Sequence, residues 1–488
     1  MGIHKSHIIA VILNVGLTTQ MAAQYHTQVG LGNYGAVHSF YINPSLSAYS
    51  AYNWQLHLAG GWANVNNNYL SLQTPYSLYR LPNNVPRAYQ TESGNPRFDK
   101  SWLRERINGR DKVAALGLDA YGPALSFKLK NWHLGFLTEG SVNVRLNDLP
   151  ESLAHAVFKE LDSAQGAFTL FNPSGNNVIG PFSVTGNSRA ALGFNISKSF
   201  KLDWNRQVLG GITIKKVWGF QGFHMSSTGM SSQQINQDSV LISPTNIQML
   251  EYGSQPGHGW GIDIGATYIF HKKDFKRHGE YAKKHTKYFA KLGFSIMDIG
   301  SVKYTDATYR TVDVRTSTGV NLNKTYTGTS DYQQALDSFM RAFGTYTVSN
   351  GNAIIGLPTR AVISADMQMQ KYIYVSAVIS QSFRSQKSEH ARYQSFLMVS
   401  PRYERRFFEF SLPLLLEYDY RSLRMGASLR FGPFYIGTNS LMSFVNTRKM
   451  NDADIFAGIV LSNLSEFSFR KQARNKSKSS KSNSCFAF

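Results

Sequence analysis

The chain has little cysteine and little charge. It holds a single Cys in 488 residues, which excludes a disulfide framework and any multi-cysteine metal or iron–sulfur site. Charged residues make up 17%, against about 25% in an average soluble protein. No run of about 18 apolar residues occurs, so no helix is expected to span a bilayer.

Residues of strands and turns take the place of the missing charge. The chain contains 26 Tyr, 31 Phe and 40 Gly, residue types that favour strands and tight turns. The net charge is strongly positive, at +21. The length allows two or three soluble domains or one large barrel.

The first 23 residues have the layout of a secretory signal peptide. His4 and Lys5 give a weakly positive start, residues 8–17 form a short apolar core, and Ala22 and Ala23 are small residues before a cut. We therefore predict a signal peptide over 1–23 and export of the mature chain. A buried helix of a cytosolic protein is the alternative.

Apolar and polar residues alternate along much of the remaining chain. In 361–369, Ile363 and Met367 fall on one face, and Ser364 and Asp366 fall on the other. A period of two indicates a strand between an apolar and a polar side. The pattern recurs in 132–146, 188–197, 261–270 and 421–431. Its polar faces carry single charges that we expect to face a barrel lumen, at Glu139, Arg145, Asp263, Asp366, Arg424 and Arg430.

The candidate strands number fourteen, and short and long connections alternate between them. An even number with this asymmetry is typical of outer-membrane barrels, which have short periplasmic turns and long extracellular loops. Closure supplies every backbone amide in lipid with a partner. A soluble protein with an aromatic-rich core is the alternative. The predicted strands are 54–72, 113–129, 132–146, 188–200, 207–224, 258–270, 287–305, 361–369, 372–383, 393–403, 406–418, 421–431, 434–444 and 453–461.

Two stretches in predicted extracellular loops have helical spacing. Leu149, Leu153 and Val157 recur every four residues, and a similar pattern covers 332–343. Each is either a loop helix that packs on the barrel rim or a lid over a ligand route.

The chain ends in a basic, Ser-rich run. Residues 470–482 hold six Lys or Arg and no acid, and 271–287 is also basic. Such runs are usually disordered and solvated. Contact with anionic lipid headgroups fits both, whereas nucleic-acid binding does not fit an exported chain that lacks interleaved aromatics.

Catalytic and metal-binding motifs are absent. The chain has no Gly-x-Ser-x-Gly elbow, no His-Glu-x-x-His and no Walker loop. Its 13 His are dispersed. Asp263, Asp366, Glu409 and Glu417 could line a site, but interior charges usually pair across a barrel. We therefore predict no enzyme activity, catalytic residue, cofactor or metal.

An Asn43-Pro44-Ser45 step follows the predicted signal closely. In this it resembles the long-chain fatty acid transporter (FadL-like) superfamily of outer-membrane barrels. The resemblance implies that this segment forms a hatch in a fourteen-stranded barrel. Two further stretches, 291–304 and 431–438, look like an uncharacterised Bacteroidetes-type family of such barrels. The residues that carry this second likeness are Asp298, Gly300, Lys303, Tyr304, Gly432, Pro433 and Gly437.

These observations predict an all-β, transmembrane antiparallel barrel in the outer membrane of a Gram-negative bacterium. Its parts would be an N-terminal plug (24–53), the barrel (54–465) and a basic tail (466–488). Expected partners are outer-membrane lipid, lipopolysaccharide and a hydrophobic small molecule. The first functional hypothesis is passive transport of hydrophobic or amphipathic molecules, and the second is a partner-binding accessory or shuttle of a secretion or surface-attachment system.

Overall fold

A computed structural model describes residues 29–76, 85–90, 99–162, 177–203, 205–236, 239–271, 288–314, 318–321, 345–445 and 450–464. The predicted signal peptide, the basic tail, most of the 271–287 cluster and the 332–343 helix lie outside these residues. No helix within the described ranges is long and apolar enough to cross a membrane.

The described chain forms a closed antiparallel barrel. Its main sheet contains 19 strands. In five cases two successive strands are the two halves of one wall strand, separated by a few residues. The wall therefore has fourteen strands, as predicted. The strands of the main sheet are β1 (Tyr52–Asn67), β4 (Lys112–Tyr121) with β5 (Ala124–Leu129), β6 (Trp132–Leu149), β8 (Phe182–Lys201), β9 (Arg206–Ser227), β12 (Thr245–Tyr252) with β13 (Gly257–His271), β14 (Tyr288–Val314), β16 (Thr345–Gly356) with β17 (Arg360–Gln368), β18 (Ile373–Ser382), β19 (Phe396–Glu404), β20 (Phe408–Ser411) with β21 (Leu414–Glu417), β22 (Ser422–Met425) with β23 (Ala427–Phe431), β24 (Phe434–Thr438) and β25 (Asp452–Leu464).

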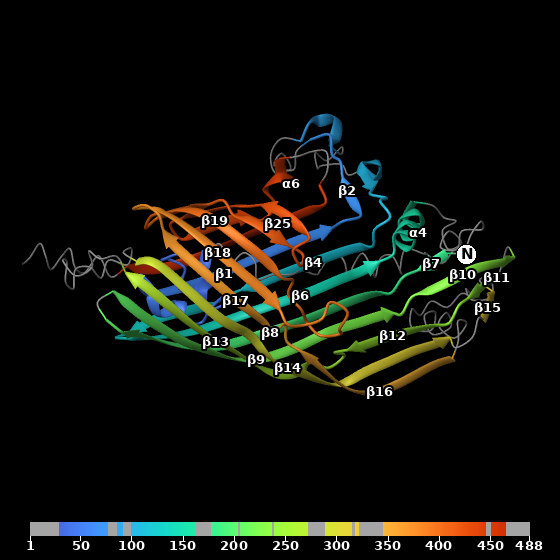
Figure 1. Cartoon of the computed structure of the whole chain (residues 1–488), viewed down its shortest axis with the longest axis horizontal. Helices are drawn as coiled ribbons and strands as arrows, with labels where there is room; N and C mark the ends of the chain where they lie inside the picture. Colours follow the sequence, from blue (N-terminus) through green and yellow to red (C-terminus); the bar gives the residue numbers. More distant parts are fainter. Residues whose placement is uncertain are drawn as a thin grey trace, which may run out of the picture.

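The first and last strands close the wall. β1 pairs with β25 in a register that runs from Tyr52 opposite Leu464 to Asn66 opposite Asp452. β1 also pairs with β4 and β5 on its other side, so the ring is complete (Figure 1). The fourteen strands therefore form a ring in which most backbone amides find partners, and within the described residues only one paired neighbour is found for β16, which is β14, and for β22, which is β21.

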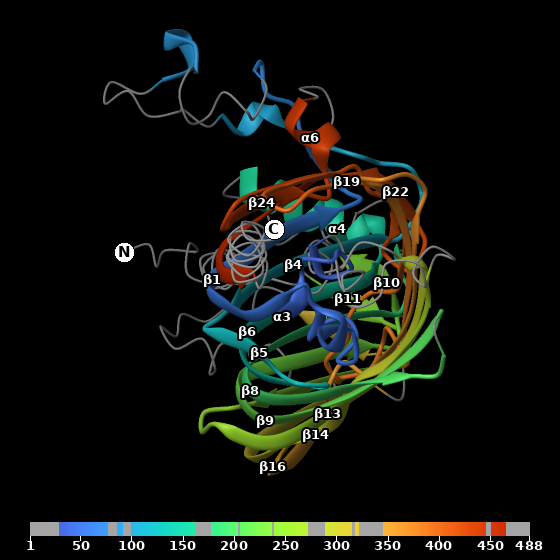
Figure 2. The same cartoon turned by 90° about the vertical axis from the view of Figure 1, so that its left-hand side faces the viewer.

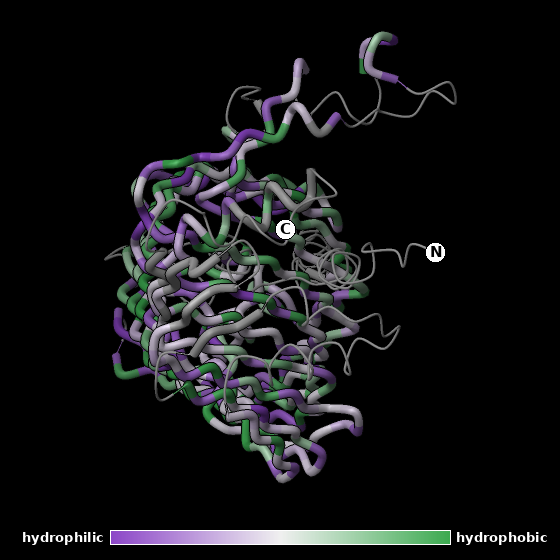
Figure 3. Tube along the Cα trace, turned by 90° about the vertical axis from the view of Figure 1, so that its right-hand side faces the viewer, coloured by the Kyte–Doolittle hydropathy of each residue, from purple (hydrophilic) through white to green (hydrophobic). Residues whose placement is uncertain are grey.

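The apolar face of each strand points outward. Ile363, in β17, is 53% exposed and Phe294, in β14, is 51% exposed, whereas Asp366 is buried. This arrangement is the reverse of that in a soluble protein, which buries its apolar face. Hydrophilic and hydrophobic residues are accordingly mixed along the wall in Figure 3. The predicted alternation is confirmed, with the polar faces inside.

The two ends of the barrel differ. Tight turns at 130–131, 202–205, 369–372, 405–407 and 432–433 share one end, called here the short-turn end. Longer connections, such as 68–111 and 150–181, lie at the other end, called here the loop end. This asymmetry matches the prediction.

Strands extend beyond the predicted bounds at the loop end. We expected one long loop after residue 305, but β14 continues to Val314 and pairs with β12 and with β16, which begins at Thr345. The polar composition of these extensions concealed them. The prediction was also wrong at 441–444, expected as the end of the strand 434–444, because these residues lie in the helix α6 (Leu441–Val445).

Smaller elements complete the loop end. The predicted helix near 149–161 is confirmed as α4 (Glu151–Asp162). The strands β7 (Asn177–Ile179), β10 (Met230–Asn236), β11 (Ser239–Ile242) and β15 (Thr318–Asn321) form a separate sheet, at the right of Figure 1. The remaining pieces are β2 (Leu70–Leu72) with β3 (Leu103–Glu105), and the 3-10 helices η3 (Arg87–Tyr89) and η4 (Lys100–Trp102).

Candidate functional site in the barrel lumen

Residues 29–51 lie inside the barrel and are called here the lumen segment. It contains the short helix α3 (Ala36–Ser39) and the 3-10 helix η1 (Leu46–Tyr49), and nearly all its residues are buried. Seen from the short-turn end, α3 lies within the ring of strands (Figure 2). Any route along the barrel axis therefore has to pass this segment.

The Asn43-Pro44-Ser45 step forms the turn between the two helices. The Asn43 side-chain oxygen accepts hydrogen bonds from the Ser45 N–H at 3.0 Å and from the Ser45 hydroxyl at 2.7 Å. The Leu46 N–H donates to the Asn43 carbonyl at 3.1 Å. An Asn followed by Pro favours such a turn, because its side chain replaces a backbone acceptor. The turn was predicted, but its wall contacts were not.

Asn43 also joins the turn to the wall. Its Nδ2 lies 3.2 Å from the Ala266 carbonyl and 3.3 Å from the Phe294 carbonyl and from the Thr267 hydroxyl. Ser45 Oγ lies 2.8 Å from the same Thr267 hydroxyl. The polar edge of the turn therefore faces β13 and β14 and satisfies its hydrogen-bonding groups there.

Two glycines make room for this turn. A Cβ added at Gly265 would lie 2.1 Å from Asn43 Oδ1, and one added at Gly211 would lie 2.5 Å from the Pro44 carbonyl carbon. Both distances are far inside van der Waals contact. The wall therefore has a seat shaped for the turn, which consists of Gly211, Gly265 and Thr267.

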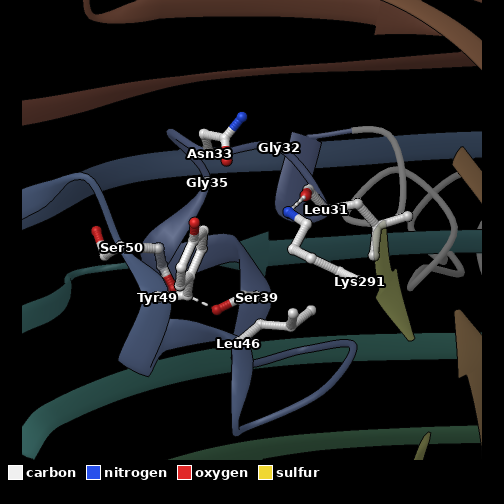
Figure 4. A pocket seen from close by; sticks show the side chains of 11 residues that line it. Leu31, Gly32, Asn33, Gly35, Ser39, Leu46, Tyr49, Ser50 and Lys291 are labelled. Carbon is white, nitrogen blue, oxygen red and sulfur yellow. Dashed lines mark hydrogen bonds between the residues drawn. The ribbon is translucent and has the colours of Figure 1, made fainter. Parts of the chain in front are cut away.

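Three further wall side chains hold backbone carbonyls of the lumen segment. Lys291 Nζ donates to Leu31 O at 2.8 Å, a contact drawn in Figure 4. Arg360 donates to Tyr41 O at 2.9 Å, and the Ser295 hydroxyl donates to Ile42 O at 2.6 Å. These three donors lie on β14 or β17, and Gln55 of β1 and Asn195 of β8 hold the segment from other parts of the wall.

Buried charges of the lumen form compensated networks. Lys215 Nζ lies 2.7 Å from Asp298, 3.0 Å from Asp263 and 3.6 Å from Glu139. Four charges from four strands thus meet at one point of the lumen. A buried charge is tolerated when an opposite charge lies this close. Asp263 and Glu139, predicted as separate lumen charges, belong to the same network.

A second network reaches the lumen segment. Arg402 lies 2.7 Å from Glu404 and 3.3 Å from Asp366, and Arg430 lies 3.2 Å from Glu409. The Glu404 carboxylate also accepts the Asn33 N–H at 3.0 Å. Arg402 and Glu404 therefore connect the predicted Asp366 to the segment, and the predicted Arg430 lies 5.1 Å from the centre of the segment's Tyr34 ring.

The other two predicted lumen charges lie elsewhere. Arg424 lies 3.1 Å from Glu417 and 2.6 Å from Asp452. Arg145 is buried and donates to the His390 carbonyl at 3.4 Å. The six predicted charges therefore do not form one site. Within the described ranges, no group of three or more His, Cys, Asp or Glu could hold a metal ion.

The residues that carry the family resemblance lie in different parts of the barrel. Asp298 has a φ of 57°, and its N–H donates to Asp263 at 2.7 Å. Gly300 has a φ of 152°, and Lys303 is exposed while Tyr304 is buried. At the short-turn end, Gly432 has a φ of 57° in the turn before Pro433. Gly437 lies against Phe456, whose ring would be 2.3 Å from an added Cβ.

The lumen contacts of Lys215, Lys291, Arg360 and Arg402 were not predicted. A signal for them was present, because each is a lone cation on the inward parity of an alternating strand. Their partners could not be inferred, since these lie on strands distant in the sequence.

A cavity beside the lumen segment is small. Its lining includes Gly30, Asn33, Tyr49, Ser50 and Lys291 (Figure 4). Its free space accommodates about one water molecule. With the segment in this position, the cavity is too small for a hydrocarbon ligand.

Comparison with known protein families assigns the chain to one of them. A family model described as "Family of unknown function (DUF5723)" matches residues 44–439. The chain belongs to this family. The match begins within the Asn43-Pro44-Ser45 turn and includes thirteen of the fourteen wall strands. No curated protein matches the chain.

Solved structures similar to this DUF5723 member include two toluene transporters and a FadL homologue. The toluene transporter TbuX of Ralstonia pickettii is 10% identical, with 87% of this chain and 92% of that chain covered and a TM-score of 0.37. A FadL homologue of Pseudomonas aeruginosa is 11% identical, covered at 86% and 91%, with a TM-score of 0.37. The toluene transporter TodX of Pseudomonas putida is 10% identical, covered at 86% and 90%, with a TM-score of 0.35. A FadL homologue, the kind of protein that the sequence resembles, is thus one of these similar structures.

Proposed function

We propose that the protein is an outer-membrane channel for hydrophobic or amphipathic small molecules, closed by a plug over residues 24–53. The outward apolar face of a closed barrel supports the membrane location, because water would not favour such a surface. The predicted signal peptide supports export. In this orientation the short-turn end faces the periplasm, and the loop end faces outward.

The observation that carries the proposal is the seating of the lumen segment. The turn fits against two glycines and is held largely by hydrogen bonds, several of them at 3.2–3.3 Å. Each such bond contributes about 0.5–1.5 kcal/mol net. The attachment is therefore specific in position yet weak enough bond by bond to be exchanged for water when the segment shifts.

Transport requires that shift. The cavity beside the segment has room for about one water molecule, so a ligand can enter that space only after the segment leaves its seat. Wild-type protein in liposomes is expected to admit a hydrophobic dye slowly, and protein without residues 24–50 is expected to admit it faster.

A reversible tether tests the plug directly. Ser45 Oγ and Thr267 Oγ1 lie 2.8 Å apart, so we expect S45C/T267C, built with Cys485→Ser, to form a disulfide between segment and wall. Oxidised protein should admit dye at the background rate, and reduction should restore uptake. The single variant S45C is the matched control, since it cannot form the tether. Equal uptake in both redox states, with the disulfide verified by mass, would contradict the plug.

The second candidate is a partner-binding accessory or shuttle. The separate sheet of β7, β10, β11 and β15 at the loop end supports it, because peptides can pair with the edges of such a sheet. This candidate predicts a sealed lumen in every state. Dye exclusion by wild type, by the reduced tether variant and by protein without residues 24–50 would favour it over transport.

A further inference from the structure

The short-turn end carries positive charge without matching negative charge. Across the described turns and their flanking residues (128–132, 198–203, 205–207, 369–373, 403–408 and 431–435), eight Lys or Arg accompany two acids. Both acids are already paired: Asp203 lies 2.6 Å from Arg206, and Glu404 lies 2.7 Å from the lumen residue Arg402. Most of the cations at this end therefore remain uncompensated by these acids.

Two of these cations converge on one aromatic ring. Lys371 Nζ lies 5.3 Å from the centre of the Tyr372 ring, and the Arg405 guanidinium carbon lies 4.5 Å from the same centre. Arg405 also lies 5.5 Å from the centre of the Tyr403 ring. The two charges are thus within about 10 Å of each other, comparable with the Debye length in physiological salt. Two like charges held this close together attract an anion more strongly than either does alone.

No protein anion fills this position within the described part of the chain. Both Lys371 and Arg405 are exposed, and neither forms an ion pair there. The aromatic rings stabilise cations but do not neutralise them. The pair, called here the rim cations, therefore retains two positive charges.

The two turns that carry the rim cations also carry exposed apolar side chains. Met369 is 60% exposed, Phe407 is 57% exposed and Ile373 is 40% exposed. A ligand that fits has a negative headgroup for the cations and an apolar tail for these side chains. A phospholipid combines the two, and its phosphate is a strong hydrogen-bond acceptor for Lys and Arg.

We propose that the rim cations bind the phosphate of an anionic phospholipid, such as phosphatidylglycerol, in the periplasmic leaflet of the outer membrane. This inference rests on the proposed function for the membrane location and orientation. It adds a specific lipid-binding site at the short-turn end. The site holds the β17–β18 and β19–β20 turns against the headgroups.

Native mass spectrometry of the detergent-solubilised full chain tests the site. The probe is an equimolar mixture of phosphatidylglycerol and phosphatidylcholine. With about 1 kcal/mol for each cation near an anionic headgroup, K371Q/R405Q should lower the preference for phosphatidylglycerol about 30-fold. K371Q alone should lower it about fivefold, and R405K should retain the preference, because charge rather than shape is required.

The matched control removes two cations from the loop end. Lys387 and Arg421 are 56% and 57% exposed, and each lies within 4.0 Å of Asp148. K387Q/R421Q changes the net charge equally and should keep the preference within about twofold. An equal loss in both double variants would overturn the inference, as would full retention in K371Q/R405Q. If K371Q/R405Q does not fold, the comparison of K371Q with K387Q decides.

Two further measurements distinguish a lipid site from a phosphate site, and this inference from the transport proposal. Inorganic phosphate at millimolar concentration should leave the phosphatidylglycerol adduct in place, and its displacement would indicate a site for free phosphate instead. Dye uptake is measured on the same variants. Retained uptake without lipid preference overturns this inference alone, whereas lipid preference without uptake in any variant overturns the transport proposal alone.

Discussion

Replacing Asn43 by Ala should release the lumen segment from its seat. The substitution removes contacts at 3.2–3.3 Å to Ala266, Phe294 and Thr267, and two shorter bonds within the turn. At about 0.5 kcal/mol for each of the three long bonds and about 0.5–1 kcal/mol for each of the two short ones, the seated state loses roughly 2.5–3.5 kcal/mol. The population of the unseated state should therefore rise about 70- to 400-fold.

Hydrogen exchange read by mass spectrometry measures this population. The amides of Ile42 and Asn43 both donate to Ser39 O in the seated segment, at 3.0 and 2.8 Å. Peptides over 36–49 should exchange about 70- to 400-fold faster in N43A, while peptides from β8 and β9 keep their protection. N131A, at an exposed turn, is the control. Unchanged exchange over 36–49, with the barrel intact, would refute the reasoning.

Three further predictions concern the seat of the turn, a buried charge network of the lumen and the docking of α4. Gly211→Ala should accelerate exchange over 36–49 or lower the melting temperature, because its Cβ meets Pro44 backbone, whereas Gly210→Ala has its nearest neighbour at 4.0 Å and should do neither. Lys215→Met leaves buried carboxylates unpaired and should lower the free energy of unfolding in detergent by about 3–5 kcal/mol, whereas the same change at the half-exposed Lys216 should have an effect of less than about 1 kcal/mol. Burial opposes ionisation of Glu151, but the Asn108 and Gly109 amides and Lys112 outweigh this effect and lower the pKa of Glu151. The docking of α4 is therefore complete above the ordinary pKa of about 4.3 and weakens as pH falls through the lowered pKa. E151Q should show the weakened docking at pH 7, measured as faster hydrogen exchange over 106–112.

The strand count could be predicted because successive residues of a wall strand alternate between two environments, lipid outside and the polar lumen inside. In β17 the outward Ile363 and the inward Asp366 differ in burial as their chemistry requires. A wall between lipid and a polar lumen leaves this period in the sequence wherever the apolar band extends. Beyond the band the period fades, and β12, β16 and the end of β14 were missed for that reason.

The candidate site could be predicted only in part. Asn43 and Pro44 indicate a turn by their own chemistry, but the glycines that seat it lie more than 160 residues away along the chain. The same holds for Lys215, whose partners lie on three other strands. The position of a residue along an alternating strand shows that its side chain points inward. Its partner depends on strand order and register, which no local sequence pattern contains.

The joining of β1 to β25 sets an order of events in assembly. The lumen segment immediately precedes β1, and the strand that completes the ring is β25, the last strand of the described residues, with Asp452 through Leu464 opposite β1. Enclosure of the segment is therefore finished only when the final strand arrives. A chain that stops before Asp452 would leave β1 with a row of unsatisfied amides, ready to pair with a neighbouring molecule.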